Sequence, residues 1–216
     1  MTNFTMPVVY PITDAQISGL SHTAQVEKLI AGGAKLIQLR EKYLSPQEFY
    51  DDAREALKIA HANDVKILIN DRVDLARVLK ADGVHLGQTD LPPDEARKIL
   101  GATAIIGFST HNVEQVREAL KMPIDYIAFG PVFNTTTKEN PDAVVGLETL
   151  KRIGEIIKNH DETKFPLIAI GGITGENAVE VLKAGADSVA IISDLLREPH
   201  KITDKMLEAV SKILCF

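Results

Sequence analysis

The sequence predicts an α/β fold and, within that class, a single-domain (β/α)8 TIM barrel over residues 1–216. Short apolar runs alternate with amphipathic segments along the whole chain, and the runs are apolar on both faces, as in a parallel sheet covered by helices. Eight such strand–helix units fit into 216 residues, which is close to the lower size limit of about 200 residues for this barrel. The alternative is a doubly wound open sheet, which usually has fewer strands, and no GxGxxG motif follows the first strand.

The eight expected strands are short, and most of them are apolar throughout. Pro11 is unusual in the middle of the first strand, because proline lacks the N–H that a sheet hydrogen bond needs. Three junctions, which begin at Ala34, Ala81 and Ala186, resemble one another as they lead from a helix end into a strand. The expected strands cover residues 8–13, 35–40, 66–70, 84–86, 104–108, 126–129, 167–170 and 189–192.

The clearest helix start lies at Ser45. Serine is a good N-cap, Pro46 suits the first helical position, and Glu48 completes a capping box. One apolar face with helical spacing follows, formed by Phe49, Ala53, Ala56, Leu57 and Ala60. The other helices are expected over residues 26–31, 73–80, 113–120, 147–158, 178–183 and 203–216, with one more beginning at the proline pair 92–93.

The composition is that of a folded protein without a basic surface. Hydrophobic residues make up 45% of the chain, enough for a sizeable core, and the formal net charge is −6. A nucleic-acid surface needs a basic stripe, so we expect no nucleic-acid partner and only a local site for any anion. Cys215 is the single cysteine, which excludes an intramolecular disulfide and favours a reducing compartment.

The sequence contains no predicted targeting or membrane-spanning segment. Residues 1–13 lack the pattern of a signal peptide, and no apolar stretch approaches the length that a membrane span needs. We therefore expect a cytoplasmic protein with no membrane partner. The sequence leaves open whether the chain forms a homo-oligomer.

Polar side chains continue the second expected strand with a spacing of two. Gln38, Arg40 and Lys42 therefore point the same way in an extended chain, toward the barrel mouth when the apolar residues between them face the helices. A buried cation needs a compensating anion, so we interpret these residues as part of an anion-binding set. The alternative is that both cations pair with Glu41 or with other surface carboxylates.

Carboxylates follow the third and fourth expected strands. Asn70 and Asp71 close the third strand, and Asp90 lies just beyond the fourth. Neighbouring strands lie about 4.8 Å apart, so the two carboxylates can converge on one cation. A few hard oxygen ligands suit Mg²⁺, whereas zinc would need a cluster of Cys and His ligands. The alternative is that each aspartate caps a helix.

The loop that follows the sixth strand is rich in hydrogen-bond donors. It runs from Gly130 to Lys138 and supplies the hydroxyls of Thr135, Thr136 and Thr137 together with one ammonium group. Such donors suit a cluster of anionic oxygens. The alternative is a solvated connection without a ligand.

The ends of the seventh and eighth strands carry small residues. Gly172 follows Gly171, and Ser193 follows the eighth strand. The loops after strands seven and eight form the usual phosphate site of this barrel, and glycine lets backbone amides approach a phosphate closely. Ordinary turn geometry is the alternative for the glycine pair.

The fifth strand is followed by Ser109 and His111. A histidine at that place can act as an acid or base, although a lone one more often makes a structural hydrogen bond. His85, inside the fourth strand, is interpreted as a core residue whose hydrogen bonds are satisfied.

The mouth thus has two predicted anion-binding regions. Arg40, Lys42 and Lys138 form one with a metal, and Gly172, Ser193 and residues 135–137 form the other. Two phosphate-bearing substrates, one of them a diphosphate that needs Mg²⁺, fit this arrangement.

These residues closely resemble the motifs of the thiamine-phosphate synthase family. The similarity covers nearly the whole chain in the same order. It is carried by Gln38-Leu39-Arg40-Glu41-Lys42, Ile69-Asn70-Asp71, Val84-His85-Leu86-Gly87-Gln88-Thr89-Asp90, Gly107-Phe108-Ser109-Thr110-His111, Gly130-Pro131-Val132-Phe133, Thr135-Thr136-Thr137-Lys138 and Ala169-Ile170-Gly171-Gly172-Ile173. The departures are Asn134, where the family has proline, and Asp194-Leu195, where small residues are commoner.

The resemblance implies a TIM barrel that joins a hydroxymethylpyrimidine diphosphate to a thiazole phosphate, giving thiamine phosphate and pyrophosphate. It assigns the pyrimidine diphosphate to Gln38, Arg40, Lys42, Asn70, Ser109 and Lys138. It assigns Mg²⁺ to Asp71 and Asp90. It assigns the thiazole phosphate to Thr135, Thr136, Thr137, Gly172, Ile192 and Ser193.

Two other functions remain as alternatives. A thiazole tautomerase on the same barrel would use His111 as an acid or base and would need neither a diphosphate nor a metal. A non-catalytic sensor of phosphorylated ligands would not require the metal pair. Retention of Asp71 and Asp90 together with the basic residues favours the synthase.

Overall fold

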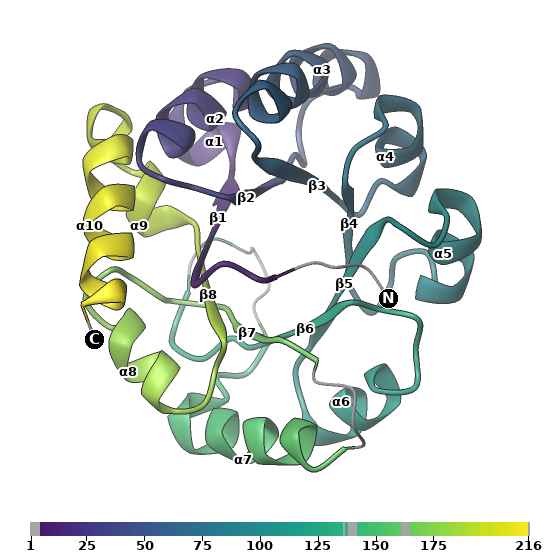
Figure 1. Cartoon of the computed structure of the whole chain (residues 1–216), viewed down its shortest axis with the longest axis vertical. Helices are drawn as coiled ribbons and strands as arrows, with labels where there is room; N and C mark the ends of the chain where they lie inside the picture. The colour runs from purple at the N-terminus through teal and green to yellow at the C-terminus, as the bar shows by residue number, and fades with distance from the viewer. Residues whose placement is uncertain (1–4, 136, 138–141, 161–164, 216) are drawn as a thin grey trace.

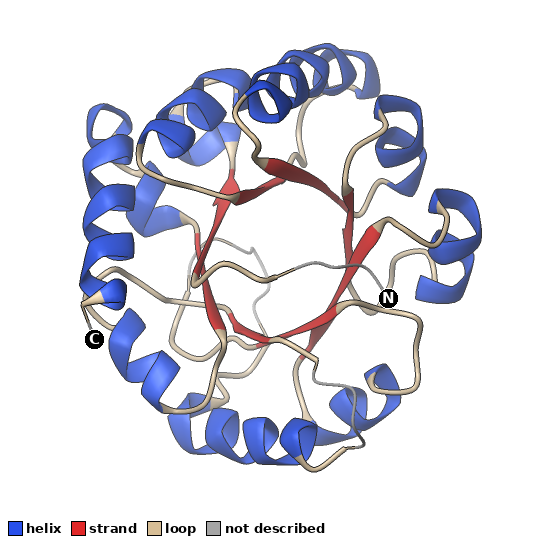
Figure 2. Cartoon of the chain, viewed as in Figure 1, coloured by secondary structure: helices blue, strands red, loops and turns tan. Residues whose placement is uncertain are grey.

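Eight parallel strands pair in chain order and close on themselves, because β1 is hydrogen-bonded to β8 as well as to β2. The computed structural model describes residues 5–135, 137, 142–160 and 165–215. Figure 1 looks down the barrel, and Figure 2 shows the strands as a closed ring inside the helices. The strands are β1 (Val9–Thr13), β2 (Leu36–Leu39), β3 (Lys66–Asn70), β4 (Gly83–Leu86), β5 (Ile105–Thr110), β6 (Tyr126–Phe129), β7 (Leu167–Ala169) and β8 (Ser188–Ile191).

Helices follow the strands and form the outer layer of the barrel (Figure 1). They are α1 (Ala15–Ser18), α2 (His22–Ala31), α3 (Pro46–Ala62), α4 (Val73–Leu79), α5 (Pro93–Leu100), α6 (Val113–Ala119), α7 (Gly146–Lys158), α8 (Ala178–Lys183), α9 (Ser193–Leu196), the 3-10 helix η1 (Pro199–Lys201) and α10 (Ile202–Leu214). The predicted single-domain (β/α)8 barrel is confirmed. The open-sheet alternative is wrong, because the first and last strands pair with each other.

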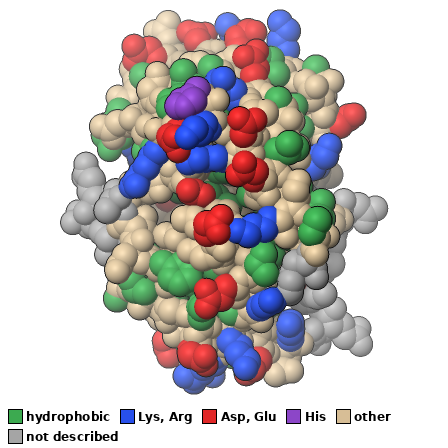
Figure 3. Space-filling view, turned by 90° about the vertical axis from the view of Figure 1, so that its left-hand side faces the viewer, with side chains coloured by type: hydrophobic (Ala, Val, Ile, Leu, Met, Phe, Trp, Pro, Cys, Tyr) green, Lys and Arg blue, Asp and Glu red, His purple; other side chains and the backbone are tan. Residues whose placement is uncertain are grey.

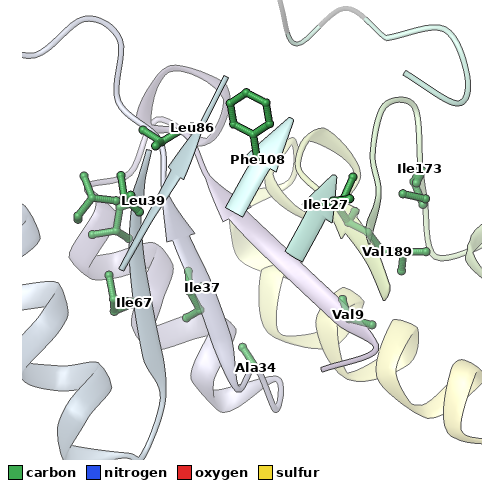
Figure 4. Close-up of a cluster of buried hydrophobic side chains, with 14 of the residues drawn as sticks. Val9, Ala34, Ile37, Leu39, Ile67, Leu86, Phe108, Ile127, Ile173 and Val189 are labelled. Carbon is green, nitrogen blue, oxygen red and sulfur yellow. The ribbon is translucent and has the colours of Figure 1, made fainter. Parts of the chain in front are cut away.

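Apolar side chains fill both sides of the sheet. The larger cluster lies between strands and helices, and Figure 4 shows part of it, with Ile37, Leu39 and Ile67 among its members. The smaller cluster fills the barrel interior and consists of Tyr10, Ile12, Leu36, Leu68, Ile105, Tyr126, Ala128, Ile168 and Ala190. Successive residues of β2 therefore alternate between the two sides, as the sequence predicted.

The capping box at the start of α3 is confirmed. The Ser45 hydroxyl accepts from the Glu48 N–H, and the Glu48 carboxylate accepts from the Ser45 N–H. The predicted apolar face of this helix is buried along its whole length. The helix packs against α2 and β3.

The structure extends or adds elements where polar residues obscured the pattern. β5 continues two residues past its predicted end, because Ser109 and Thr110 pair with β6 and the Thr110 hydroxyl donates to the Ala128 carbonyl at 2.9 Å. α2 begins at His22, whose polar first turn carries no apolar signal. α1, α9 and η1 are too short to show a periodic pattern. Pro11 does lie inside β1, opposite Ile191 of β8.

None of the helices in the described part of the chain is both long and apolar enough to cross a membrane. Acidic and basic side chains are interspersed on the face that carries α10 (Figure 3). Cys215 is exposed as a free thiol. The cytoplasmic location and the lack of a nucleic-acid partner stay predictions.

Candidate active site

A cavity of about 740 Å³ opens at the carboxyl ends of the strands. It brings together residues from all the strand ends that the sequence singled out, although these lie far apart in the chain. The predicted site residues that line it are Gln38, Arg40, Lys42, Asn70, Asp71, Asp90, Ser109, Thr135, Thr137, Gly172, Ile192 and Ser193. The predicted site residues Thr136 and Lys138 lie outside the described residues.

The two cations of the second strand end are each paired with a carboxylate. The Arg40 guanidinium contacts the Asp14 carboxylate, and the Lys42 ammonium contacts the Asp71 carboxylate. Carboxylates therefore neutralise both cations, as the alternative reading of the sequence expected, but the partners are Asp14 and Asp71 and not Glu41. A guanidinium has five donors and an ammonium three, so both groups retain donors for an anion in the cavity.

Sequence reasoning missed Asp14 as the partner of Arg40. Its Oδ1 accepts from the N–H groups of Gln16 and Ile17 and so caps α1, while its Oδ2 faces Arg40. Asp14 directly follows the last residue of β1. The strand-end rule applied to the other strands would therefore have found it.

Glu41 accepts hydrogen bonds from the loop after β2 and is not a partner of the two cations. Its Oε1 accepts from three consecutive backbone N–H groups, those of Lys42 at 2.7 Å, Tyr43 at 2.6 Å and Leu44 at 3.1 Å. Its Oε2 lies 3.0 Å from Nε2 of the fully buried His22. The carboxylate thus fixes the backbone that carries Lys42 into the mouth.

The hydrogen bonds to Glu41 also set its ionisation. Burial on its own would raise the pKa of this carboxyl, but the hydrogen bonds from Tyr43, His22, Leu44 and Lys42 outweigh it and hold the pKa below the ordinary value of 4.5. Glu41 is therefore a carboxylate throughout the neutral range, which keeps all its acceptor positions available.

Asp71 and Asp90 lie at the same place in the mouth, as predicted. Asp71 has a left-handed backbone with φ of 60°, and its N–H donates to the His85 carbonyl at 2.9 Å. Asp90 Oδ2 accepts from the Gly87 N–H at 2.7 Å. The N-cap of α4 is Arg72 and that of α5 is Pro92. The helix-cap alternative is therefore wrong for both aspartates.

The Asp71 carboxylate changes the ionisation of Asp90. Burial raises the pKa of Asp90, and the neighbouring Asp71 carboxyl raises it further through a hydrogen bond and like charge, against the opposing effects of the Gly87 N–H and Lys42. A divalent cation between the two groups would remove this repulsion. The donor set therefore fits Mg²⁺, which takes one or two protein carboxylates and fills its octahedron with water and phosphate oxygens.

Zinc fits the site less well. Among the described residues, no group of three or more His, Cys, Asp or Glu side chains is arranged to hold a metal ion. Zinc in a structural site needs four such ligands, and in a catalytic site three. The absence of a closed protein cage agrees with an ion that shares its coordination sphere with a substrate.

The polar floor of the cavity is made by side chains that point inward from the strands. Gln38 Nε2 donates to the Tyr10 hydroxyl at 2.9 Å, and Nε2 of His85 lies 2.8 Å from the Ser109 hydroxyl. Nδ1 of His85 lies 2.8 Å from the Tyr126 hydroxyl, so both ring nitrogens have partners. The interpretation of His85 as a satisfied core residue is confirmed. Burial lowers its pKa to about 4, with Asp71 acting in the opposite direction, so the ring is neutral at pH 7.

The loops after β6 and β7 are joined through their backbones. The Val132 N–H donates to the Ile170 carbonyl at 2.9 Å, and the Phe133 N–H donates to the Gly171 carbonyl at 3.0 Å. Gly172 has φ of 65°, and a Cβ there would lie 2.5 Å from the Asn134 carbonyl oxygen. Glycine is therefore required by the turn and by the close approach, whatever ligand the loops bind.

The departures from the family pattern fit this region of the structure. Asp194 Oδ2 accepts from the Gly175 N–H at 2.9 Å and so links α9 to the loop after β7. Leu195 is buried. Asn134 is exposed and meets Gly172 through its backbone carbonyl, so its side chain does not form this contact.

His111 makes the structural hydrogen bond that a lone histidine near a strand end usually makes. Its Nδ1 lies 2.6 Å from the Gly130 carbonyl, which can only accept, so Nδ1 carries a proton. Nε2 lies 3.5 Å from Asp142, and both residues line the cavity. One ring nitrogen is thus committed to holding the loop, which leaves Nε2 alone for any acid–base role.

Together, fold and site define a class: a (β/α)8 barrel whose mouth gathers paired carboxylates, cations and glycine-rich loops, an arrangement typical of enzymes that act on phosphorylated substrates. Residues 9–195 match the family model described as thiamine monophosphate synthase. The chain belongs to this family.

Individual relatives agree with the family match. The chain is 45% identical over 210 residues to a thiamine-phosphate synthase from Koribacter versatilis (strain Ellin345), covering 94% of this chain and 95% of that protein. It is 46% identical over 190 residues to a thiamine-phosphate synthase from Clostridium novyi (strain NT), covering 88% and 90%. A solved thiamine phosphate pyrophosphorylase from Pyrococcus furiosus superposes with a TM-score of 0.82 at 34% identity, covering 95% of this chain and 96% of that one.

The resemblance found in the sequence is thereby confirmed, and with it the thiamine-phosphate synthase function and the transferase class. The need for Mg²⁺, the roles of single residues and the oligomeric state stay predictions.

Proposed function

We propose that the barrel mouth holds a hydroxymethylpyrimidine diphosphate and a thiazole phosphate together and joins them, with the help of Mg²⁺, into thiamine phosphate and pyrophosphate. The observation that carries this proposal is the convergence of the Asp71 and Asp90 carboxylates with Arg40 and Lys42 on one cavity. A diphosphate is the ligand whose charge and oxygens such a set of groups complements.

The diphosphate would lie against the cations and the carboxylate pair. Lys42 would exchange part of its contact with Asp71 for phosphate oxygens, and Arg40 would keep Asp14 on one nitrogen while it donates through others. Mg²⁺ held by Asp71 and Asp90 would supply positive charge next to the departing oxygens. The family resemblance completes this set with Gln38, Asn70, Ser109 and Lys138.

The reaction breaks the bond between the pyrimidine methylene carbon and the diphosphate oxygen, and the electron pair leaves with the pyrophosphate. The thiazole nitrogen then donates its electron pair to the methylene carbon. Charge builds on the leaving group, so Arg40 and Lys42 act by stabilising it as it develops. The protein needs no nucleophile of its own, and its other contribution is to orient the two substrates.

The thiazole phosphate would lie on the opposite side of the mouth. Gly172 and Ser193 offer backbone N–H groups and a hydroxyl there, and Thr135 and Thr137 add two hydroxyl groups from the loop after β6. Ile192, half-buried beside them, offers an apolar surface to the substrate.

The test is to mix both phosphorylated substrates with and without Mg²⁺ and to follow pyrophosphate release. Release that needs both substrates and the metal supports the proposal. Binding without release would support the phosphate-ligand sensor. Isomerisation of a thiazole phosphate without metal, abolished by His111→Asn, would support the tautomerase.

A further inference from the structure

A chain of hydrogen bonds crosses the barrel beneath the cavity. It runs from Gln38 to the Tyr10 hydroxyl at 2.9 Å, then to the Tyr126 hydroxyl at 3.0 Å. From there it continues to His85 Nδ1 at 2.8 Å, and from His85 Nε2 to the Ser109 hydroxyl at 2.8 Å. Its two ends, Gln38 and Ser109, line the cavity, whereas the tyrosines are buried beneath it.

The packing around this chain keeps its members in place. The rings of Tyr10 and Tyr126 meet edge to face with centroids 5.9 Å apart, and His85 stacks on Tyr126 at 5.6 Å. Gly107 makes room for the Tyr126 phenol, since a Cβ at that position would lie 1.9 Å from its Cζ. Gly107 therefore makes the position of Tyr126 possible, and Ser109 of the same motif forms one end of the hydrogen-bond chain.

The direction of the chain follows from counting hydrogens. Each hydroxyl has one hydrogen, and a neutral imidazole has one N–H. The Tyr10 oxygen accepts from Gln38, so its hydrogen goes to Tyr126, and the Tyr126 hydrogen then goes to His85 Nδ1. The proton of His85 must consequently be on Nε2, which donates to Ser109.

The direction of these hydrogen bonds determines what Gln38 and Ser109 can offer a ligand. Ser109 accepts from His85, so its own hydrogen remains to be donated into the cavity. Gln38 is held by its amide nitrogen, so its carbonyl oxygen remains as an acceptor, and the amide cannot turn over without reversing every bond behind it. Both tyrosine hydroxyls are buried, which makes such a reversal costly.

We propose that this chain is a specificity device, which fixes Gln38 as an acceptor and Ser109 as a donor and so selects a pyrimidine with an amino group over the same ring with an oxo group. The inference rests on the proposed function for its substrate. An amino group can donate to the Gln38 oxygen, whereas an oxo group would set two acceptors against each other. A site built in this way rejects the wrong group strongly, because its own polar atoms are left unpaired. Tyr126 and His85 are accordingly positioning residues.

The first test determines the direction of the hydrogen bonds in the absence of substrate. In the whole enzyme labelled with ¹⁵N-histidine, the His85 signals, assigned by their loss in His85→Gln, are expected to show the proton on Nε2. A proton on Nδ1 would overturn the proposal, because the chain would then run the other way. This measurement is independent of turnover, so failure of the proposed function would leave it readable.

The second test removes the central hydroxyl with Tyr126→Phe. We expect the His85 tautomer signal to become mixed, and KM for the aminopyrimidine diphosphate to rise about tenfold with a much smaller change in kcat. The preference for the aminopyrimidine over the oxopyrimidine diphosphate should fall by about tenfold or more. An unchanged preference together with a changed tautomer would overturn the specificity role.

The matched control is Tyr50→Phe, which removes a tyrosine hydroxyl from the outer helix α3, where the ring packs under Arg54 at 5.6 Å. It should leave the His85 signals, KM and the preference as they are. Should Tyr126→Phe fail to fold, Tyr10→Phe breaks the same chain one bond earlier and serves the same readouts. Equal effects of the control and the chain variants would overturn the proposal.

Discussion

The two halves of the mouth offer a ligand different chemical groups. The charged half, at the ends of β2 to β5, presents Arg40, Lys42, Asp71 and Asp90 as side chains. The glycine half, at the ends of β6 to β8, presents turns whose backbone groups lie against each other around Gly172.

The difference lies in what must change when a ligand enters. In the charged half, Arg40 and Lys42 already contact carboxylates, so a diphosphate has to exchange partners with them. In the glycine half, backbone hydrogen bonds already join the loops. Gly172 has no charged side chain whose partner a ligand would have to replace. The charged half should therefore respond to ions and charge changes, and the glycine half to changes of shape.

The largest expected effect is on the carboxylate pair, tested with Asp90→Asn. We expect kcat/KM for pyrophosphate release to fall about 1,000-fold and the Mg²⁺ requirement to rise, because one of the two proposed metal ligands is lost. An aspartate whose pKa is raised on folding destabilises the fold at neutral pH, so the variant should be no less stable at pH 7 without metal.

The control for that variant is Asp74→Asn, which alters an exposed carboxylate paired with Arg72 at 2.6 Å. It should leave both the rate and the Mg²⁺ titration as in the unaltered protein. An Asp90→Asn enzyme with the same Mg²⁺ dependence would remove Asp90 from the metal site.

The next effect concerns two lysines at opposite ends of the barrel. Lys42 contacts Asp71 at the mouth, whereas Lys66 lies 3.3 Å from Asp82 at the opposite, amino-terminal end of the barrel. Lys42→Met should lower kcat/KM about 100-fold through lost stabilisation of the leaving group, measured by pyrophosphate release. Lys66→Met should leave it unchanged, and equal losses in both variants would mean that Lys42 acts only through stability.

A smaller effect, confined to one substrate, is expected in the glycine half. Gly172→Ala forces a residue with a Cβ into φ of 65° against the Asn134 oxygen, so KM for the thiazole phosphate should rise about tenfold. Gly185→Ala is the matched control. It also places a Cβ at a positive φ, here 108°, but nothing lies within 4 Å of that Cβ. An equal rise in KM for the pyrimidine diphosphate would show that the two halves are not separate.

The comparison also explains how far the sequence could reach. Strand order, the barrel and the inward set of β2 follow from periodicity, because Gln38 and Arg40 differ in chemistry from their apolar neighbours. The carboxylate pair could be predicted for the same reason. The glycine half could be located only from the fold, since turn geometry and ligand binding need the same glycines.

What sequence reasoning missed are hydrogen-bond and ion-pair partners. The strand-end rule would have located Asp14 but not its pairing with Arg40, and the backbone contacts of Glu41 leave no periodic signal. Tyr10 and Tyr126 look like ordinary strand residues, although a buried tyrosine hydroxyl usually has a hydrogen-bond partner. That tendency is the one clue the sequence offered to the hydrogen-bond chain across the barrel.

The smallest expected effect on catalysis comes from the support of the charged half, tested with Glu41→Gln. The variant loses a charged acceptor of backbone N–H groups, so we expect about 2 kcal/mol less stability in denaturant unfolding at pH 7 and only a small rise in KM for the pyrimidine diphosphate. The folded-state pKa of Glu41 is lowered, so its contribution is complete above the ordinary value of 4.5 and is lost as the pH falls below it. The stability of the unaltered protein should therefore fall more steeply than that of the variant as the pH drops through this range. Glu55→Gln, on the exposed face of α3 with Lys58 at 3.7 Å, is the matched control and should follow the unaltered curve. Parallel curves for Glu41→Gln and the unaltered protein would mean that the carboxylate does not hold the loop, and the charged half would then owe its shape to the ion pairs alone.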